Sequence, residues 1–278
     1  MSLLQATSID VRAGTKVLIE DMSLALAPGE FLAVIGPNGA GKSTLLGALA
    51  GDRPLAKGRV LLDGKPLGQW SKTALARRRA VLPQHSGVAF DFTGQQIAAL
   101  GLLAHRDRLS ERQMRALAEQ ALAETEALAF ADRPYTMLSG GERQRVQLAR
   151  VLAQCDADPA DRPFLLLDEP IAGLDLAHQH AALASARRRA DRGLGVLAVL
   201  HDLNMAARYA DRVAIIERGR LTVLGPAGST LDPGLLSAVF ATPIVRVEAA
   251  GATAFLSPGQ TPRICVQSDI NPPDSLMI

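Results

Sequence analysis

The sequence predicts an α/β protein in which a partly parallel sheet carries an antiparallel β subdomain and an inserted α-helical subdomain. Three observations predict this fold class. An apolar run at residues 31–35 leads through a glycine-rich loop into a helix-forming segment at 45–50, which together make a βα unit. Between about residues 87 and 155, strand patterns are missing and apolar residues recur at helical spacing. Strand patterns return at Phe164.

The first βα unit is flanked by segments with strand character. Residues 8–11 and 17–26 alternate in polarity, and residues 58–64 combine apolar side chains with a terminal turn. We expect antiparallel strands there. The inserted helices are expected where apolar residues follow helical spacing, at 100–103, 114–128 and 143–152.

The second half of the α/β core is expected to contain a further series of strands and one long helix. Its predicted strands and helix are, in order, a strand at 164–167, a helix at 176–192, a strand at 196–200 and a hairpin of strands at 212–216 and 220–224. Beyond Thr242 the pattern weakens, and residues 271–278 are expected to fray.

Composition excludes several classes of protein. Thirty Lys and Arg against 28 Asp and Glu give a net charge of +2, which gives no support to a nucleic-acid partner. No apolar run approaches the roughly 20 residues that span a bilayer, and the N-terminus lacks the features of a secretory signal. Cys155 and Cys265 do not make a disulfide framework. We therefore expect a soluble cytoplasmic protein.

The glycine-rich loop matches the phosphate-binding pattern GxxxxGK[ST] at every required position. It consists of Gly36, Pro37, Asn38, Gly39, Ala40, Gly41, Lys42, Ser43 and Thr44. Glycines let the backbone N–H groups surround a phosphate, and the following helix N-terminus adds a favourable dipole. Lys42 is placed to reach the β- and γ-phosphates, and the Ser43 hydroxyl to bind Mg²⁺. A chance glycine turn is disfavoured because the match lies between a strand and a helix. We predict a P-loop NTPase (RecA-like) core.

Two carboxylates follow the predicted strand at 164–167. Asp168 suits Mg²⁺ coordination through water, and Glu169 is placed to activate the attacking water as a general base. An acidic strand end that only caps the next turn is the alternative, and the presence of a P-loop makes it the weaker one.

Three further segments narrow the class of NTPase. Ser139, Gly140 and Gly141 open a predicted helix and would form a second anion-binding N-terminus, with Gln144 one turn later. One chain has no evident use for two phosphate cradles unless the second serves a partner's nucleotide. Gln84 ends the apolar segment 80–83. His201 follows the strand at 196–200, at the sheet edge where α/β proteins bind ligands.

In these motifs, their order and their spacing, residues 3–242 resemble the nucleotide-binding subunit of ATP-binding cassette (ABC) transporters. The resemblance identifies residues 36–44 as Walker A, Gln84 as the Q-loop glutamine, 138–144 as the signature, 165–168 as Walker B and His201 as the switch histidine. It implies ATP and Mg²⁺ as cofactors, with Ser43, Gln84 and Asp168 at the metal. Lys42, Gln84, Glu169 and His201 would be the catalytic residues.

The resemblance also implies partners and a location. Two copies would form a head-to-tail homodimer, in which Ser139, Gly140, Gly141 and Gln144 of one chain complete the nucleotide site of the other. The dimer would drive transmembrane permease subunits, expected to be two, at the cytoplasmic face of a bacterial inner membrane. A periplasmic binding protein would be an indirect partner. Where an aromatic residue often stacks on adenine, this chain has Arg12, whose guanidinium plane is a possible replacement.

The sequence gives two further expectations. Residues 1–242 form the ATPase domain, with an α/β core at 1–84 and 159–242, a helical subdomain at 85–158 and a tail at 243–278. Residues 201–211 and the loop at 156–163 resemble importers of iron chelates, haem and cobalamin, the loop favouring haem. Ferric-siderophore or cobalamin import, export, and a soluble ABC ATPase acting on DNA or ribosomes remain alternatives.

Overall fold

A computed structural model describes residues 3–84, 91–158, 164–249 and 252–258. Cys265, the segment 271–278, most of the loop at 156–163 and the start of the predicted helical subdomain at 85 lie outside the described residues. Over the described part of the chain, no helix combines the length and the apolar character needed to cross a bilayer.

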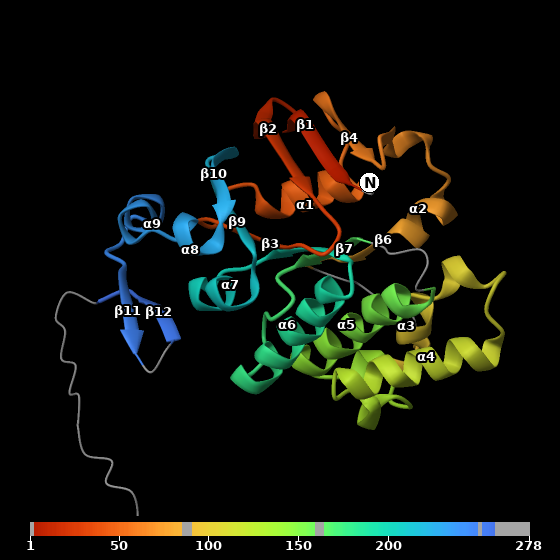
Figure 1. The fold of residues 1–278 in the computed structure, drawn as a ribbon. Coiled ribbons are helices and arrows are strands. Elements are labelled where there is room, and N and C mark those ends of the chain that lie inside the picture. Colours follow the sequence, from red (N-terminus) through yellow and green to blue (C-terminus); the bar gives the residue numbers. More distant parts are fainter. Residues whose placement is uncertain (1–2, 85–90, 159–163, 250–251, 259–278) are drawn as a thin grey trace, which may run out of the picture.

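A six-stranded sheet forms the centre of the molecule (Figure 1). Five strands are parallel and β10 pairs antiparallel with β9 at one edge. In spatial order the strands are β10 (Arg220–Pro226), β9 (Arg212–Glu217), β3 (Phe31–Ile35), β8 (Gly195–Val199), β7 (Phe164–Asp168) and β6 (Arg79–Leu82). The prediction of a partly parallel sheet is confirmed.

The central strands are buried on both faces. All five residues of β3 are buried, and they alternate between two hydrophobic clusters. Phe31, Ala33 and Ile35 face the cluster that includes the helices of the middle and second half of the chain, and Leu32 and Val34 face the other. Strands covered on both faces read as continuous apolar runs, which is why this segment was recognisable in the sequence.

The antiparallel β subdomain lies on one side of the central sheet, above helix α1 (Lys42–Ala50) in Figure 1. Its strands pair in the order β2 (Lys16–Leu26), β1 (Leu4–Ala13), β4 (Lys57–Leu62) and β5 (Lys65–Pro66), all antiparallel. The expected antiparallel strands are therefore present. A 3₁₀ turn (Leu67–Gln69) and helix α2 (Lys72–Arg78) lead back to β6.

The inserted helices lie on the opposite side of the sheet (Figure 1). They are α3 (Gly94–Leu100), α4 (Glu111–Glu124) and α5 (Gly140–Asp156). Each begins with a capping box, in which Thr93, Ser110 or Ser139 exchanges hydrogen bonds with the residue three positions later. The predicted bounds shift for that reason. The helix expected at 100–103 instead ends at Leu100, and α4 begins at Glu111 and stops at Glu124.

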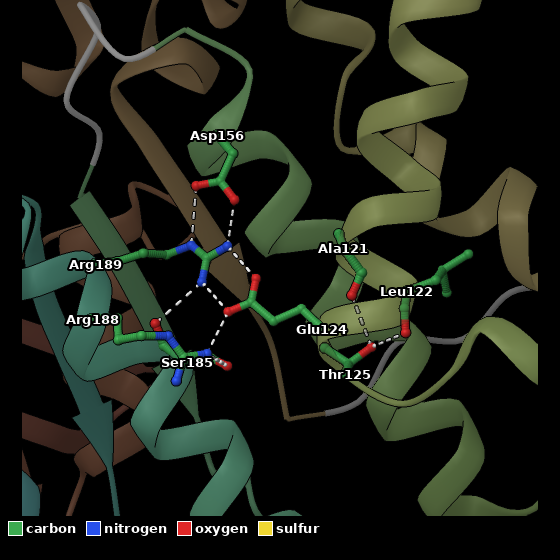
Figure 2. Close-up of polar contacts among 8 residues, drawn as sticks. All are labelled: Ala121, Leu122, Glu124, Thr125, Asp156, Ser185, Arg188 and Arg189. Atoms are coloured by element: carbon green, nitrogen blue, oxygen red, sulfur yellow. Dashed lines mark hydrogen bonds and ion pairs between the residues drawn. The ribbon is translucent and has the colours of Figure 1, made fainter.

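Three short 3₁₀ turns connect these helices, at Leu103–His105, Leu128–Phe130 and Tyr135–Met137. Helix α6 (Leu176–Asp191) lies beside α5 (Figure 1) and contacts β8 and α7. Figure 2 shows a partly buried polar cluster, centred on the buried Arg189, that joins α4, α5 and α6. This junction cluster is formed by Glu124, Asp156, Ser185, Arg188 and Arg189. Side chains from three helices meet there, so the cluster fixes the inserted helices to the core.

The chain beyond Thr242 has more structure than its weak pattern suggested. After α7 (Leu203–Tyr209), β9 and β10 come α8 (Ala227–Thr230), α9 (Pro233–Phe240) and an antiparallel hairpin of β11 (Val245–Ala249) and β12 (Ala252–Leu256). The hairpin lies beside α9, far from α3 and α4 (Figure 1). Its ring at Phe255 is 7% exposed and joins the larger hydrophobic cluster.

Candidate nucleotide site

The glycine-rich loop joins β3 to α1 and has a shape that only glycine permits at two of its positions. Gly36 has φ 149°, and a Cβ there would lie 2.0 Å from the carbonyl oxygen of Ile216. Gly41 has φ 105°, and a Cβ there would lie 2.9 Å from the carbonyl oxygen of Leu18. The loop therefore packs closely against neighbouring backbone. Its positive-φ glycines let the loop backbone form a concave surface that can bind a ligand.

Lys42 begins α1 and folds back over this loop. Its Nζ donates hydrogen bonds to the carbonyl oxygens of Gly36 (2.8 Å) and Pro37 (2.9 Å), and the residue is 5% exposed. Burial lowers the pKa of the Lys42 ammonium, while the charges of Glu169 and Asp168 act in the opposite direction. A cation held over the loop by neutral carbonyls keeps its charge available for an anionic ligand.

Ser43 and Asp168 meet although they are 125 positions apart in the sequence. The Ser43 hydroxyl donates to Asp168 Oδ1 at 3.0 Å, at the point where β7 ends. Burial raises the pKa of the Asp168 carboxyl, and the hydrogen bond from Ser43 partly offsets that rise. Two oxygen donors are thus placed side by side at the end of the loop.

Glu169 and His201 form the second pair at this edge. His201 Nε2 lies 2.7 Å from Glu169 Oε1, and the Glu169 backbone adopts φ 50°. Burial raises the pKa of the Glu169 carboxyl, but hydrogen bonds from His201 and Gln84, with the charges of His201 and Lys42, bring it below its ordinary value. The carboxyl is therefore ionised at neutral pH and able to accept a proton.

Parallel strand order explains why these groups converge. Strands β3, β8, β7 and β6 are neighbours and run in one direction, so their carboxyl ends meet at the same edge. The loop follows β3, and His201 follows β8. Asp168 ends β7 and Glu169 comes directly after it, and Gln84 follows β6. Residues that are distant in sequence become neighbours through this topology alone.

A cavity of about 950 Å³ opens above the loop. Ten of the predicted site residues line it: Asn38, Gly39, Ala40, Gly41, Lys42, Ser43, Thr44, Gln84, Glu169 and His201. Asp168 is not among the lining residues and is connected to them through its hydrogen bond with Ser43.

The remaining wall comes from residues that sequence reasoning missed: Lys16, Val17, Leu18, Arg218 and Gly219. Gly219 N donates to the carbonyl of Ala40 at 2.9 Å, so the β9–β10 turn supports the loop directly. The sequence marked Gly219 as a turn, but no local signal relates that turn to residues 36–44.

Arg12 does not belong to the described lining of the cavity. It is an exposed residue of β1, and its antiparallel partner Val17 lines the cavity in its place. Val17 is 42% exposed, so an apolar side chain is available at this wall. Arg12 and Val17 are neighbours across the β1–β2 hairpin, so the sequence prediction lies one strand away from the residue that lines the cavity.

The helix N-terminus predicted as a second anion site is present and capped, and it lies apart from this cavity. Ser139 Oγ accepts from Glu142 N at 3.3 Å, and Glu142 Oε2 accepts from Ser139 N at 2.7 Å, at the start of α5. Gln144 Nε2 donates to the backbone carbonyls of Glu169 (3.3 Å) and Pro170 (3.0 Å). The described lining of the cavity includes none of these residues (Ser139, Gly140, Gly141 and Gln144). Within one chain, the N-terminus of α5 therefore lies outside the nucleotide cavity.

The site is that of a nucleotide hydrolase, since a phosphate-binding loop, two carboxylates and a histidine meet at one edge of a parallel sheet. Comparison with known proteins agrees with this class. Residues 19–172 match the ABC transporter family, and the chain belongs to that family. It is 49% identical to the hemin import ATP-binding protein HmuV of Myxococcus xanthus, over 90% of this chain and 94% of that protein. It is 46% identical to the HmuV protein of Rhodococcus jostii, over 91% and 85%.

The fold agrees as well. A solved structure of the ATP binding subunit of an ABC transporter superimposes with a TM-score of 0.71 and 26% identity, over 81% of this chain and 90% of that chain. Both the predicted P-loop NTPase fold and the predicted family are confirmed.

Proposed function

We propose that this protein is the ATP-hydrolysing subunit of a membrane importer and that the imported substrate is haem. The observation that carries the ATPase is the single cavity in which the P-loop, Glu169, His201 and Gln84 face one another. The haem assignment is supported by relatives at 49% and 46% identity that are named hemin import ATP-binding proteins.

The residues at the end of the loop fit Mg²⁺. Ser43 Oγ and Asp168 Oδ1 are oxygen ligands 3.0 Å apart, and Gln84, which follows β6 and lines the cavity, carries an amide oxygen that could be a third. Mg²⁺ commonly takes one or two protein oxygens and completes its shell with phosphates and water. Among the described residues, no group of three or more His, Cys, Asp or Glu gathers, which suits a metal held largely by nucleotide. Bound there, Mg²⁺ would neutralise phosphate charge.

The chemistry proposed for the chain's own residues is hydrolysis of the γ-phosphate bond. The loop amides and Lys42 hold the β- and γ-phosphates. Glu169 takes a proton from a water, whose oxygen bonds to the γ-phosphorus as the bond to the β–γ bridging oxygen breaks, so that ADP and phosphate leave. His201, 2.7 Å from Glu169 Oε1, orients this carboxylate and is placed beside the γ-phosphate.

Dimerisation is proposed to complete the site. Ser139, Gly140 and Gly141 begin a 17-residue helix and do not line their own chain's cavity. A second copy, docked head to tail, would bring this helix N-terminus to the open side of the cavity, where its dipole favours phosphate. ATP would then hold two chains together, and hydrolysis would release them.

The remaining proposals concern the assembly. Two transmembrane permease subunits at the cytoplasmic face of a bacterial inner membrane, with a periplasmic binding protein as indirect partner, would use this motion for import. We also propose the domain limits: residues 1–242 for the ATPase domain, 85–158 for the helical subdomain within it and 243–278 for the tail. Val17, rather than Arg12, is proposed to contact the adenine ring, because Val17 lines the cavity.

The ATPase is tested by Glu169→Gln. We expect turnover to fall by about 10²–10⁴-fold, the range for loss of a general base, while ATP is still bound and traps a dimer on size-exclusion chromatography. Normal turnover in this variant would refute the assigned base. Lack of any ATP-dependent dimer would refute the shared site.

The substrate is tested by transport in vesicles that contain the cognate permease and binding protein. We expect ATP-dependent uptake of haem, and no uptake when Glu169→Gln replaces the native subunit. Ferric siderophore and cobalamin are the matched alternatives. Uptake of either one in place of haem would overturn the haem assignment while leaving the ATPase intact.

A further inference from the structure

The C-terminal hairpin is attached to the molecule at two helices. On one side, Ser237 of α9 binds the backbone of Ile244, with Ile244 N donating to Ser237 Oγ at 2.8 Å. On the other side, Asn204 of α7 binds Phe255 in both directions: Phe255 N donates to Asn204 Oδ1 (2.6 Å) and Asn204 Nδ2 donates to Phe255 O (3.3 Å). The hairpin thus bridges α9 and α7.

The contact with α7 uses both the backbone N–H and the backbone C=O of Phe255, a residue of the two-stranded hairpin. A strand at a sheet edge presents unpaired N–H and C=O groups, and a two-stranded hairpin is marginally stable without further packing. Asn204 satisfies both groups of Phe255, and the Phe255 ring, 7% exposed, enters the larger hydrophobic cluster. The pairing therefore orders hairpin and helix start together.

Asn204 lies three residues after His201, in a segment with little freedom. Asp202 Oδ1 accepts from Asn204 N (2.7 Å) and Met205 N (3.1 Å), which fixes the first turn of α7. A groove of about 250 Å³ extends from His201 to Phe255, Leu256 and Ser257 of the hairpin. The same short segment therefore faces Glu169 through His201 and the hairpin through Asn204.

We infer that Asn204 is a positioning residue for hydrolysis: by pairing with Phe255 it uses the C-terminal hairpin to hold the start of α7, and with it His201, against Glu169. This inference rests on the proposed ATPase function. It assigns a role in turnover to a part of the chain that lies outside the described lining of the nucleotide cavity. The inference also gives the two attachments of the hairpin different roles. The attachment to α7 lies close to His201 in the chain, whereas the attachment to Ser237 of α9 does not.

Asn204→Ala tests the inference in the full-length chain. We expect kcat for ATP hydrolysis to fall by about fivefold, because a displaced catalytic group loses alignment, and KM for ATP to stay within about twofold. Asn204→Asp keeps the acceptor for Phe255 N and loses the donor to Phe255 O, so its kcat should be intermediate. A kcat equal to that of the native chain in Asn204→Ala would overturn the inference.

Thr242→Ala is the matched control. Thr242 Oγ1 lies 3.1 Å from Ser257 Oγ, so this variant loosens the hairpin without touching α7, and its kcat should equal that of the native chain. An equal fall in both variants would show that hairpin attachment in general, and not Asn204, matters. The thermal midpoint of each variant is measured alongside, and a kcat loss that merely follows the midpoint would count against positioning.

A double variant decides whether the effect passes through His201. In a His201→Ala background with measurable residual turnover, adding Asn204→Ala should lower kcat no further, because the group it positions is gone. A further fivefold fall would show that Asn204 acts by another route. If the native chain itself hydrolyses no ATP, the proposed function fails; if the native chain is active and the Asn204 variant unchanged, only this inference fails.

Discussion

Two clusters of charged side chains, the nucleotide cavity and the junction cluster, use the same residue types to different ends. In the junction cluster, Arg189 is 2% exposed and donates to Asp156 and to both carboxylate oxygens of Glu124 at 2.9 Å (Figure 2). In the cavity, Lys42 donates to two neutral carbonyls, and the Glu169 carboxylate lines the open space. Charges that satisfy one another build structure, whereas charges directed at a cavity are available for a ligand.

The pKa directions express the same contrast. At the junction, burial raises the pKa of the Glu124 carboxyl, but Arg189, Arg188 and Ser185 outweigh burial and lower it to about 2. At the nucleotide site, burial prevails for two groups, since it lowers the pKa of Lys42 and raises that of Asp168, whereas hydrogen bonds and nearby charges lower the pKa of Glu169. Groups whose charge is penalised by burial gain most from an oppositely charged ligand.

Arg189→Met should break the junction and cause the largest loss of stability. It removes the buried cation shared by Glu124 and Asp156 and leaves Glu124 paired with the exposed Arg188. Loss of one partner of a buried pair costs about 3–5 kcal/mol. For a chain of this length, we expect the thermal midpoint to fall by roughly 10 °C, measured by circular dichroism. An unchanged midpoint would mean that the junction does not fix α4 and α5 to the core.

Lys42→Met should break the cavity and leave the fold intact. Removal of one donor to a reacting oxyanion commonly costs about 10²–10³ in turnover. ATP should raise the thermal midpoint of the native chain but not of this variant, while the midpoints without ATP should agree. Turnover within tenfold of the native rate would contradict the assigned role of Lys42.

Acid should weaken the junction through Glu124. Its pKa is lowered from 4.5 to about 2 on folding, so its stabilisation is complete above pH 4.5 and is lost as pH falls toward 2. The shift corresponds to about 3 kcal/mol. The difference in thermal midpoint between the native chain and Glu124→Gln should therefore be greatest near pH 6 and should shrink between pH 4.5 and 3. A difference that stays constant over this range would argue against a depressed pKa.

Arg188→Ala should have the smallest effect and serves as control for Arg189. Its side chain is 51% exposed and meets the same Glu124 oxygen at 2.8 Å. Exposed pairs contribute under about 1 kcal/mol because water screens them. We expect a fall in thermal midpoint of at most a few degrees. A loss as large as that of Arg189→Met would show that burial does not separate the two arginines.

Local patterns predicted the elements well where local forces decide them. The run at Phe31–Ile35 alternates between two buried faces, and the loop from Gly36 to Thr44 requires the glycines it has. Helix starts were missed by several residues where a capping box sets them, as at Ser110, although Gln113 was a visible signal. The hairpin at Val245–Leu256 was missed because its stability comes from Phe255 and Asn204, a contact between segments 51 positions apart.

The chemical groups of the site could be predicted from local sequence: a P-loop, two carboxylates after one buried strand and a histidine after another are each recognisable from their neighbours along the chain. Which of these groups lie next to one another depends on the tertiary structure. The strand order β3-β8-β7-β6 brings Ser43 to Asp168 and His201 to Glu169, and the β1–β2 hairpin puts Val17 rather than Arg12 on the wall. Contacts between distant segments depend on packing and register, and no local pattern encodes them.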